Sequence, residues 1–509
     1  MIRHFASVSG FTLLSRLSGF VRDVLLASIL GSGLVADAYF IAQRLPNHFR
    51  AIFGEGAFNS AFVPAYAREL EERGEDAARR LAGSILSALT FILIVLSAVA
   101  MWQMPFVIDL LAPGFSDEPE KFALAVTLTR ITFPYLLFVS LVTLISGTLN
   151  AHSRFASAAA APILLNLAII AALACAFLFP SAAHAAAWGI AISGVLQLAL
   201  VVLNAKRAGC LPRFVWPEHS TSLKHFLRAL GPAVIGSAGV QIAIFADTII
   251  ASLLPTGAVS AISYADRLYQ LPLGLIGIAA GTVLLPEMSR HLGRNDHATA
   301  HAAQNRSMAL TLLLTMPFFV AFLSIPEEIM RGVFMHGRFT AADASASALV
   351  LAAYGVGILP VVLIRSLVAS FHARQDTMTP LIAAFIGIAI NLVLKIALYQ
   401  SWGASGLAFA TAVGAWVNGG LLALLAYRKS WFAPDHNLAR LIIATIIAAL
   451  LLAAVTPSLK TILLSMTATL PMNAALMLIA LGLSGGIIYA LSVGITARLL
   501  KAPLPLRLR

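Results

Sequence analysis

Charged residues lie inside two strongly apolar stretches near the start of the chain, where lipid-facing helices would not carry them. The first stretch holds Arg16, Arg22 and Asp23, and the second holds Arg44 and Arg50. An ionised side chain at the centre of a bilayer costs at least about 2.5 to 3.5 kcal/mol on insertion scales. Four arginines in such positions predict a water-filled cavity that they line, and we expect the function to reside there.

Depth along the two expected helices sorts these arginines into two layers. With a turn near Ser32 at the outer surface and a rise of about 1.5 Å per residue, Arg22 and Arg44 come to lie near the bilayer midplane. Arg16 and Arg50 fall nearer the cytoplasmic side. A guanidinium binds phosphate oxygens in pairs and keeps its charge when dehydrated, so stacked arginines favour a diphosphate over a carboxylate as ligand.

Further polar residues are expected to support or gate this cavity. Ser15, Arg16, Gly19, Arg22 and Asp23 fall within one polar wedge of the first helix, because successive helical residues are about 100° apart. Asp37 begins the second span. Glu55 stands between two glycines, where a carboxylate could pair with an arginine in one conformation only. Arg130 precedes a proline in a later apolar segment, which leaves two readings open: cavity lining or a structural contact.

Composition excludes a soluble globular protein. The chain has 509 residues, of which 60% are hydrophobic and 11% charged, against about 25% charged in ordinary soluble domains. We therefore expect an all-α polytopic membrane protein with about 14 spans. Its net charge of +12 is a topology signal rather than a nucleic-acid patch, because Lys and Arg concentrate in alternate loops. The opposite side carries only Lys121, Arg331, Arg338 and Lys460, which predicts that both termini are cytoplasmic.

An internal duplication is expected. The His-x-Arg pattern of residues 152–154 recurs 220 residues later at 372–374, and other short sequence matches have nearly the same separation. The sequence thus predicts six-helix lobes over residues 1–215 and 222–430, followed at 437–509 by two extra helices and a basic cytoplasmic tail. Repeats of six spans are parallel, so a pseudo-two-fold axis should run along the membrane normal, with the substrate site between the lobes.

The second lobe carries its own charged residues at similar depths. Asp266 and Arg267 fall at the level of Arg22 and are expected either to join the cationic layer or to form a structural pair. Asp247 and Lys395 have opposite charge and matching depth, and two such charges inside a membrane favour pairing.

Four motifs carry a resemblance to a known family. The chain resembles the MurJ/MviN family of bacterial lipid II flippases, in the multidrug/oligosaccharidyl-lipid/polysaccharide exporter superfamily, over its whole length. The residues concerned are Ser15-Arg16-x-x-Gly19-x-x-Arg22-Asp23, Asp37-Ala-Tyr-Phe with Leu45-Pro46-Asn47, Glu55-Gly56-Ala57-Phe58 with Pro64, and Tyr264-Ala265-Asp266-Arg267-Leu268.

The resemblance implies a transporter of the bacterial inner membrane, without catalytic residues or cofactors. Its substrate would be lipid II, an undecaprenyl diphosphate carrying a disaccharide-pentapeptide, moved from the inner to the outer leaflet by alternating access. The implied partners are lipid II, membrane lipids and the cell-wall synthesis machinery, with a monomeric carrier and no nucleic acid. The appended helices would form a groove for the polyprenyl tail, although close helix packing explains their small residues equally well.

One departure from the family pattern argues against coupling to sodium. Some relatives are expected to hold a sodium ion with an Asp and an Asn-x-x-x-Asp pattern. Here Asn391 keeps the first position of that pattern and Lys395 replaces its second carboxylate. The lysine ammonium can take the place of the ion. We therefore expect Asp247 and Lys395 to pair, with Asn391 beside them, and this group to serve in energy coupling without a metal ion.

Three alternatives remain open at this point: a flippase for another lipid-linked oligosaccharide, a drug/cation antiporter of the same superfamily, and an enzyme acting on polyprenyl phosphates. The antiporter would need carboxylates where this chain has arginines. The enzyme would need a cluster of metal-binding carboxylates, and the sequence contains no Asp-x-x-Asp and no His/Cys ligand spacing. The sequence has no nucleotide-binding motif either, so the energy source is left between membrane potential, protons and sodium.

Overall fold

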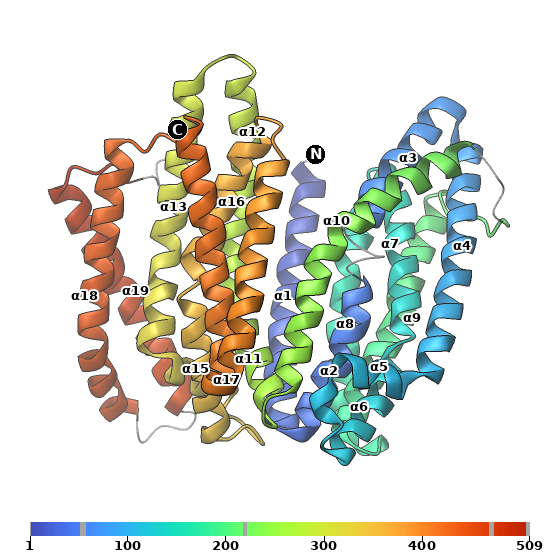
Figure 1. The fold of residues 1–509 in the computed structure, drawn as a ribbon, viewed down its shortest axis with the longest axis horizontal. Helices are drawn as coiled ribbons and strands as arrows, with labels where there is room; N and C mark the ends of the chain where they lie inside the picture. The colour runs from blue at the N-terminus through green and yellow to red at the C-terminus, as the bar shows by residue number, and fades with distance from the viewer. Residues whose placement is uncertain (1, 51–56, 217–220, 468–472, 505–509) are drawn as a thin grey trace. The chain divides into compact units, whose positions relative to one another are not determined.

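The computed structural model describes residues 2–50, 57–216, 221–467 and 473–504, and within these ranges it contains helices and turns but no strand (Figure 1). The expected all-α class is therefore confirmed. The chain divides into two compact units, Met1–Ser260 and Ala261–Arg509.

In the first unit, α8 packs against both α1 and α9, α2 packs against α6, and α3 packs against α10. Its elements are α1 (Ile2–Leu30), α2 (Leu34–Arg50), α3 (Ala57–Arg73), α4 (Glu75–Trp102), α5 (Met104–Leu111), η2 (Pro113–Phe115), α6 (Pro119–Thr132), α7 (Tyr135–Ala151), α8 (Ala156–Ala174), η3 (Ala176–Leu178), α9 (Ala182–Arg207) and α10 (Thr221–Ser252).

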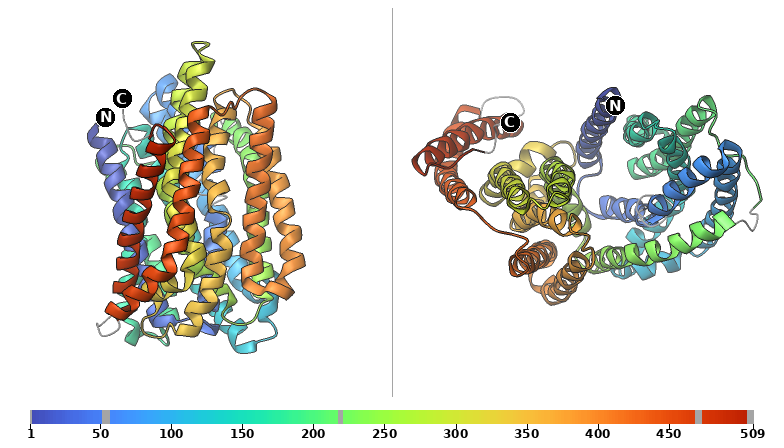
Figure 2. Two further views of the ribbon diagram at one scale, coloured as in Figure 1. Left: turned by 90° about the vertical axis from the view of Figure 1, so that its left-hand side faces the viewer. Right: turned by 90° about the horizontal axis from the view of Figure 1, so that it is seen from above.

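In the second unit, α13 packs against α12, α16 and α18, while α18 and α19 lie side by side (Figure 2). Its elements are α11 (Ala258–Pro272), whose first turn belongs to the first unit, η4 (Leu273–Gly277), α12 (Ile278–Leu292), α13 (His297–Ser324), α14 (Pro326–Phe334), α15 (Ala341–Gly355), α16 (Ile358–His372), α17 (Met378–Arg428), α18 (His436–Thr467) and α19 (Asn473–Leu499).

Nine helical segments in the described ranges are long and apolar enough to cross a membrane, judged by length and composition. They are Glu75–Trp102, Pro119–Ala151, Ala156–Ala174, Ala182–Arg207, His297–Ser324, Ala341–His372, Met378–Arg428, His436–Met466 and Asn473–Leu499. A multi-pass membrane protein is thus confirmed. The first compact unit includes α10, which the sequence-based repeats assign to the second lobe. A repeat in sequence and a compact unit in space are different divisions, so the lobes stay a prediction.

Local chemistry explains where several helices begin and bend. At the start of α15, Thr340 Oγ1 accepts from the backbone N–H of Asp343 at 3.2 Å, and the Asp343 carboxylate accepts in return from the backbone N–H of Thr340 at 2.8 Å. This reciprocal cap satisfies two N–H groups that the helix leaves without partners. Within α17, Gly403 has φ 55° and ψ −137°, which kinks this 51-residue segment into two helices.

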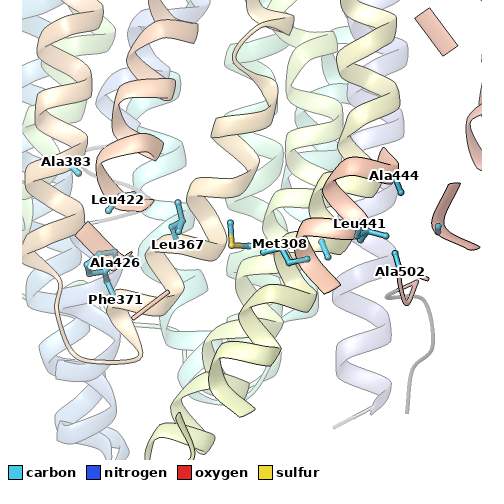
Figure 3. Packing of buried hydrophobic residues seen from close by; sticks show 12 residues of the cluster. Met308, Leu367, Phe371, Ala383, Leu422, Ala426, Leu441, Ala444 and Ala502 are labelled. Carbon is cyan, nitrogen blue, oxygen red and sulfur yellow. The ribbon is translucent and has the colours of Figure 1, made fainter. Parts of the chain in front are cut away.

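Apolar side chains from four helices form the core at one end of the second unit (Figure 3). Met308 of α13, Phe371 of α16, Leu422 of α17 and Leu441 of α18 are all less than 8% exposed, and Ala502 packs against them from beyond α19. Burial of this kind holds long helices together because their helical propensity alone is a minor contribution.

Close approach of α8 and α9 depends on Gly189. A Cβ added there would lie 2.8 Å from Ile169 Cα and 3.1 Å from the Ala168 carbonyl oxygen, which is closer than packed atoms tolerate. At Gly482 in α19 the same addition would meet nothing within 4 Å.

We predict that Gly189→Ala lowers the stability of the protein by about 1 to 3 kcal/mol, as overpacking does. Gly482→Ala is the matched control, because it also places alanine in an apolar helix but meets no neighbour. Thermal unfolding of both variants in detergent, followed by tryptophan fluorescence, checks the prediction. Equal unfolding temperatures for Gly189→Ala and the parent would contradict it.

Candidate functional site

Arg22 and Asp23 form a buried ion pair on α1. Nη2 and Nε of Arg22 lie 2.7 and 3.0 Å from Asp23 Oδ1, and the two residues are 7% and 8% exposed. The guanidinium also donates from Nη1 to Asn166 Oδ1 on α8 at 2.9 Å. The Asp23 carboxylate balances the positive charge of Arg22 and binds the edge of the guanidinium formed by Nε and Nη2. A phosphate oxygen could take the place of that carboxylate at the same edge.

The face of α1 that carries Arg22 packs against Asn166. The backbone carbonyl of Ser15 and the hydroxyl of Ser18 both accept from Asn166 Nδ2, at 2.9 and 3.0 Å. Ser15 itself is half-buried, so the structure brings it together with Arg22 on one face. Arg16, which the sequence placed in the same wedge, is exposed.

Asp37 lies in a second buried network, at the start of α2. Its carboxylate is fully buried and accepts from the backbone N–H groups of Gly257 and Ser260, each at 2.8 Å. These N–H groups belong to the first turn of α11, so Asp37 acts as a cap for that helix. Lys121 Nζ on α6 lies 3.5 Å from the same carboxylate and is 1% exposed. The buried negative charge thereby has both hydrogen bonds and a countercharge.

Lys121 connects this carboxylate to two connecting segments of the first unit. Its ammonium donates to Thr256 Oγ1 at 2.9 Å and to Glu118 Oε1 at 3.3 Å, and it lies 4.2 Å from the centre of the Phe115 ring. Thr256 in turn donates to Glu118 at 2.5 Å. That hydroxyl, assisted by the Lys121 ammonium, holds the pKa of Glu118 below its usual value. The network therefore joins the loop before α6 to the connection between α10 and α11.

Arg44 and Arg130 of the first unit have contacts of their own. Arg44 is half-buried on α2 and lines a small cavity with His48 and Thr248, which are 3.5 Å apart through Nε2 and Oγ1. Arg130 is exposed, and its Nε donates to the Met101 carbonyl at 3.1 Å. Both readings of Arg130, cavity lining and a structural contact, stay predictions. Arg50 ends α2, and its side chain, like the whole of Glu55, lies outside the described residues.

The second unit holds the remaining candidates. Asp266 and Arg267 are half-buried on α11, and Gln270 one turn later donates to the Asp266 carboxylate. Lys395 on α17 is 2% exposed, with Asn391 half-buried one turn before it. Asp247 is half-buried on α10 of the first unit. The pairing of Asp247 with Lys395 stays a prediction.

Sequence reasoning missed two residues that hold these networks together. Asn166 is the one polar residue between positions 163 and 174, and an amide in such an apolar run was a usable signal. Lys121 was interpreted as the lone basic residue of an external loop, but it is buried against Asp37. Asp117 and Glu120 nearby are acidic and exposed, so only the tertiary contact distinguishes Lys121 from a loop lysine.

We predict that Lys121→Met destabilises the protein by about 3 to 5 kcal/mol, because it leaves the buried Asp37 carboxylate without its countercharge. Lys206→Met is the control, since Lys206 is exposed at the end of α9 and has no ion pair among the described residues. Thermal unfolding in detergent at neutral pH checks both variants. A Lys121→Met protein as stable as the parent would show that the pair does not stabilise the fold.

Comparison with known proteins places the chain in one family. A family model described as "Lipid II flippase MurJ" matches residues 26–481. A "Probable lipid II flippase MurJ" of Rhizobium meliloti (strain 1021) is 43% identical over 460 residues, covering 89% of this chain and 86% of that protein. The "Lipid II flippase MurJ" of Burkholderia cenocepacia is 35% identical, with 89% of each chain covered.

Solved structures agree with the sequence matches. A "Lipid II flippase MurJ, inward closed conformation" superposes with a TM-score of 0.80 at 27% identity, covering 97% of this chain and 99% of that one. An inward-facing MATE family multidrug transporter reaches a TM-score of 0.67 at 15% identity, and this match shows a common fold alone. The family model and the relatives cover most of the sequence, and the chain therefore belongs to the lipid II flippase MurJ family.

Proposed function

We propose that this protein moves lipid II from the inner to the outer leaflet of the cytoplasmic membrane, and that arginines of its apolar helices bind the diphosphate. Family membership makes it a transporter of lipid II rather than an enzyme. The observation that carries the assignment of the site is Arg22, a buried guanidinium held in place by Asp23 and Asn166. A diphosphate can exchange with Asp23, because phosphate oxygens and a carboxylate bind a guanidinium in the same way.

The remaining candidate residues would act at different stages of transport. Arg44 and Arg267 would share the diphosphate with Arg22, and Asp266 would support Arg267. Arg16 and Arg50 would act earlier, on the cytoplasmic side, where loading and gate closure take place, with Glu55 as a partner in one conformation.

Alternating access would use the architecture expected from the sequence. That architecture has about 14 spans, six-helix lobes at 1–215 and 222–430, and an appended pair of helices. Both termini would be cytoplasmic, supported by the scarcity of Lys and Arg in the opposite loops. A monomer is proposed as the working unit, next to the cell-wall synthesis machinery.

A drug/cation antiporter is the second candidate within the fold, because a MATE transporter shares the architecture. Cationic drugs need carboxylates in the binding cavity, whereas the proposed site is rich in arginine. The lipid II flippase is therefore the function that we retain.

We predict that Arg22→Ala and Arg267→Ala abolish function while the protein remains abundant in the membrane, because each removes a bidentate phosphate ligand. Lysine should rescue poorly at both positions, since a point charge lacks the planar fork. The measurement is growth after depletion of the native protein, together with the amount of lipid II in the inner leaflet, which should rise.

Arg73→Ala is the matched control for this experiment. Arg73 pairs with Glu69 at the end of α3, and its side chain is 58% exposed, so its loss should leave growth unchanged. Full complementation by either Arg22→Ala or Arg267→Ala would disprove the assignment of that residue. Accumulation of a different lipid-linked precursor would disprove lipid II as the substrate.

We further predict that translocation does not require sodium, because the ammonium of Lys395 stands where a second carboxylate would be needed to hold the ion. Lys395 is buried, so its charge would repel a sodium ion at short range. Lipid II translocation in sealed proteoliposomes, with sodium replaced by potassium at constant membrane potential, checks this. A rate that falls when sodium is removed would show that coupling to sodium survives the change to lysine.

A further inference from the structure

Asn166 of α8 lies across from Arg22 and contacts α1 at three points. Its Oδ1 accepts from Arg22 Nη1 at 2.9 Å, while its Nδ2 donates to the Ser15 carbonyl at 2.9 Å and to Ser18 Oγ at 3.0 Å. Asn166 is 5% exposed, so these contacts replace the hydrogen bonds that water would make. We propose that Asn166 is a positioning residue, which holds the guanidinium of Arg22 in the orientation that receives the diphosphate; this rests on the proposed role of Arg22.

The hydrogen bonds decide which way the amide faces. Ser18 Oγ donates its own hydrogen to the Ser15 carbonyl at 3.0 Å, so towards Asn166 it acts as an acceptor. Both acceptors on α1 therefore require the NH₂ group of Asn166. The amide oxygen is left for Arg22, and a rotated amide would lose the bonds to Ser15, Ser18 and Arg22 together.

The surface of α1 is shaped to receive this amide. Ser15, Ser18, Gly19 and Arg22 are spaced at i, i+3, i+4 and i+7, which places them on one helical face. A Cβ added at Gly19 would lie 3.4 Å from Asn166 Nδ2, which is ordinary van der Waals contact, so the amide packs directly over this part of α1. The polar face that the sequence assigned to a cavity is thus in part a docking face for one residue of α8.

The two partners of Arg22 differ in charge and in the edge that they bind. Asp23 accepts from Nε and Nη2 through one oxygen and neutralises the guanidinium, whereas Asn166 accepts from Nη1 and carries no charge. A phosphate competes with the carboxylate for the Nε and Nη2 edge, and the amide bond to Nη1 can persist during this exchange. Asn166 would thereby hold the guanidinium in the same orientation while Asp23 is displaced. A binding group that is already oriented loses less conformational entropy when its ligand arrives.

The test is a double-mutant cycle on lipid II binding to the full-length protein in lipid nanodiscs. We expect Asn166→Ala to weaken binding roughly 10- to 100-fold, as loss of a hydrogen bond to a charged group does. Arg22→Ala should weaken it as well, and the double variant should bind no worse than Arg22→Ala alone, because Asn166 acts through Arg22. A residue with a merely structural role would instead lower binding by the same factor in both backgrounds.

Two further variants keep the test decisive. Asn204→Ala is the control, because the side chain of Asn204 on α9 bonds, among the described residues, only to the Leu200 carbonyl of its own helix. This variant should bind lipid II as the parent does. Asn166→Asp preserves the size of the side chain but places a second carboxylate beside Arg22, so it should also weaken binding.

The outcomes separate the two proposals. Parent-like binding by Asn166→Ala or Asn166→Asp, or additive effects in the double variant, would overturn the role of Asn166 and leave that of Arg22 intact. Parent-like binding by Arg22→Ala would overturn the diphosphate assignment of Arg22 itself, and the positioning role with it.

Discussion

Every buried charge needs a partner, and this constraint explains both networks of the first unit. A charged group removed from water is tolerated only with a countercharge or several hydrogen bonds. Arg22 has both, from Asp23 and Asn166, and Asp37 has both, from Lys121 and the first turn of α11. Each network is needed for the protein to fold. Any role of these residues in transport must leave their buried charges partnered.

The two networks meet the constraint differently. At Arg22 the countercharge comes from the next residue of the same helix, and only the neutral amide comes from elsewhere. A ligand can thus replace Asp23 without separating two helices. At Asp37 the partners come from α6 and from the connection between α10 and α11, so loss of the carboxylate would release several segments together. The first arrangement suits ligand exchange, and the second suits a fixed attachment.

Transport of a lipid-linked diphosphate places opposite demands on an arginine. The guanidinium must stay dehydrated and balanced when the carrier is empty, yet remain open to phosphate oxygens when the lipid arrives. In the proposed mechanism, Asp23 on one edge balances the charge of the guanidinium in the empty carrier, and Asn166 on the other edge keeps it in place when a phosphate competes for the first edge.

The sequence alone determined the all-helical class and the multi-pass character, because apolar length is a local property, and it predicted a role for the arginines of the first helices from the cost of intramembrane charge. Tertiary structure decided the partners. Asn166 is 144 residues from Arg22, and Ser260 is 223 residues from Asp37, so no helical periodicity could join them. The helical wheel placed Arg22 and Asp23 in one polar wedge, but only the structure shows that they form an ion pair, because the long arginine side chain reaches back to the adjacent carboxylate.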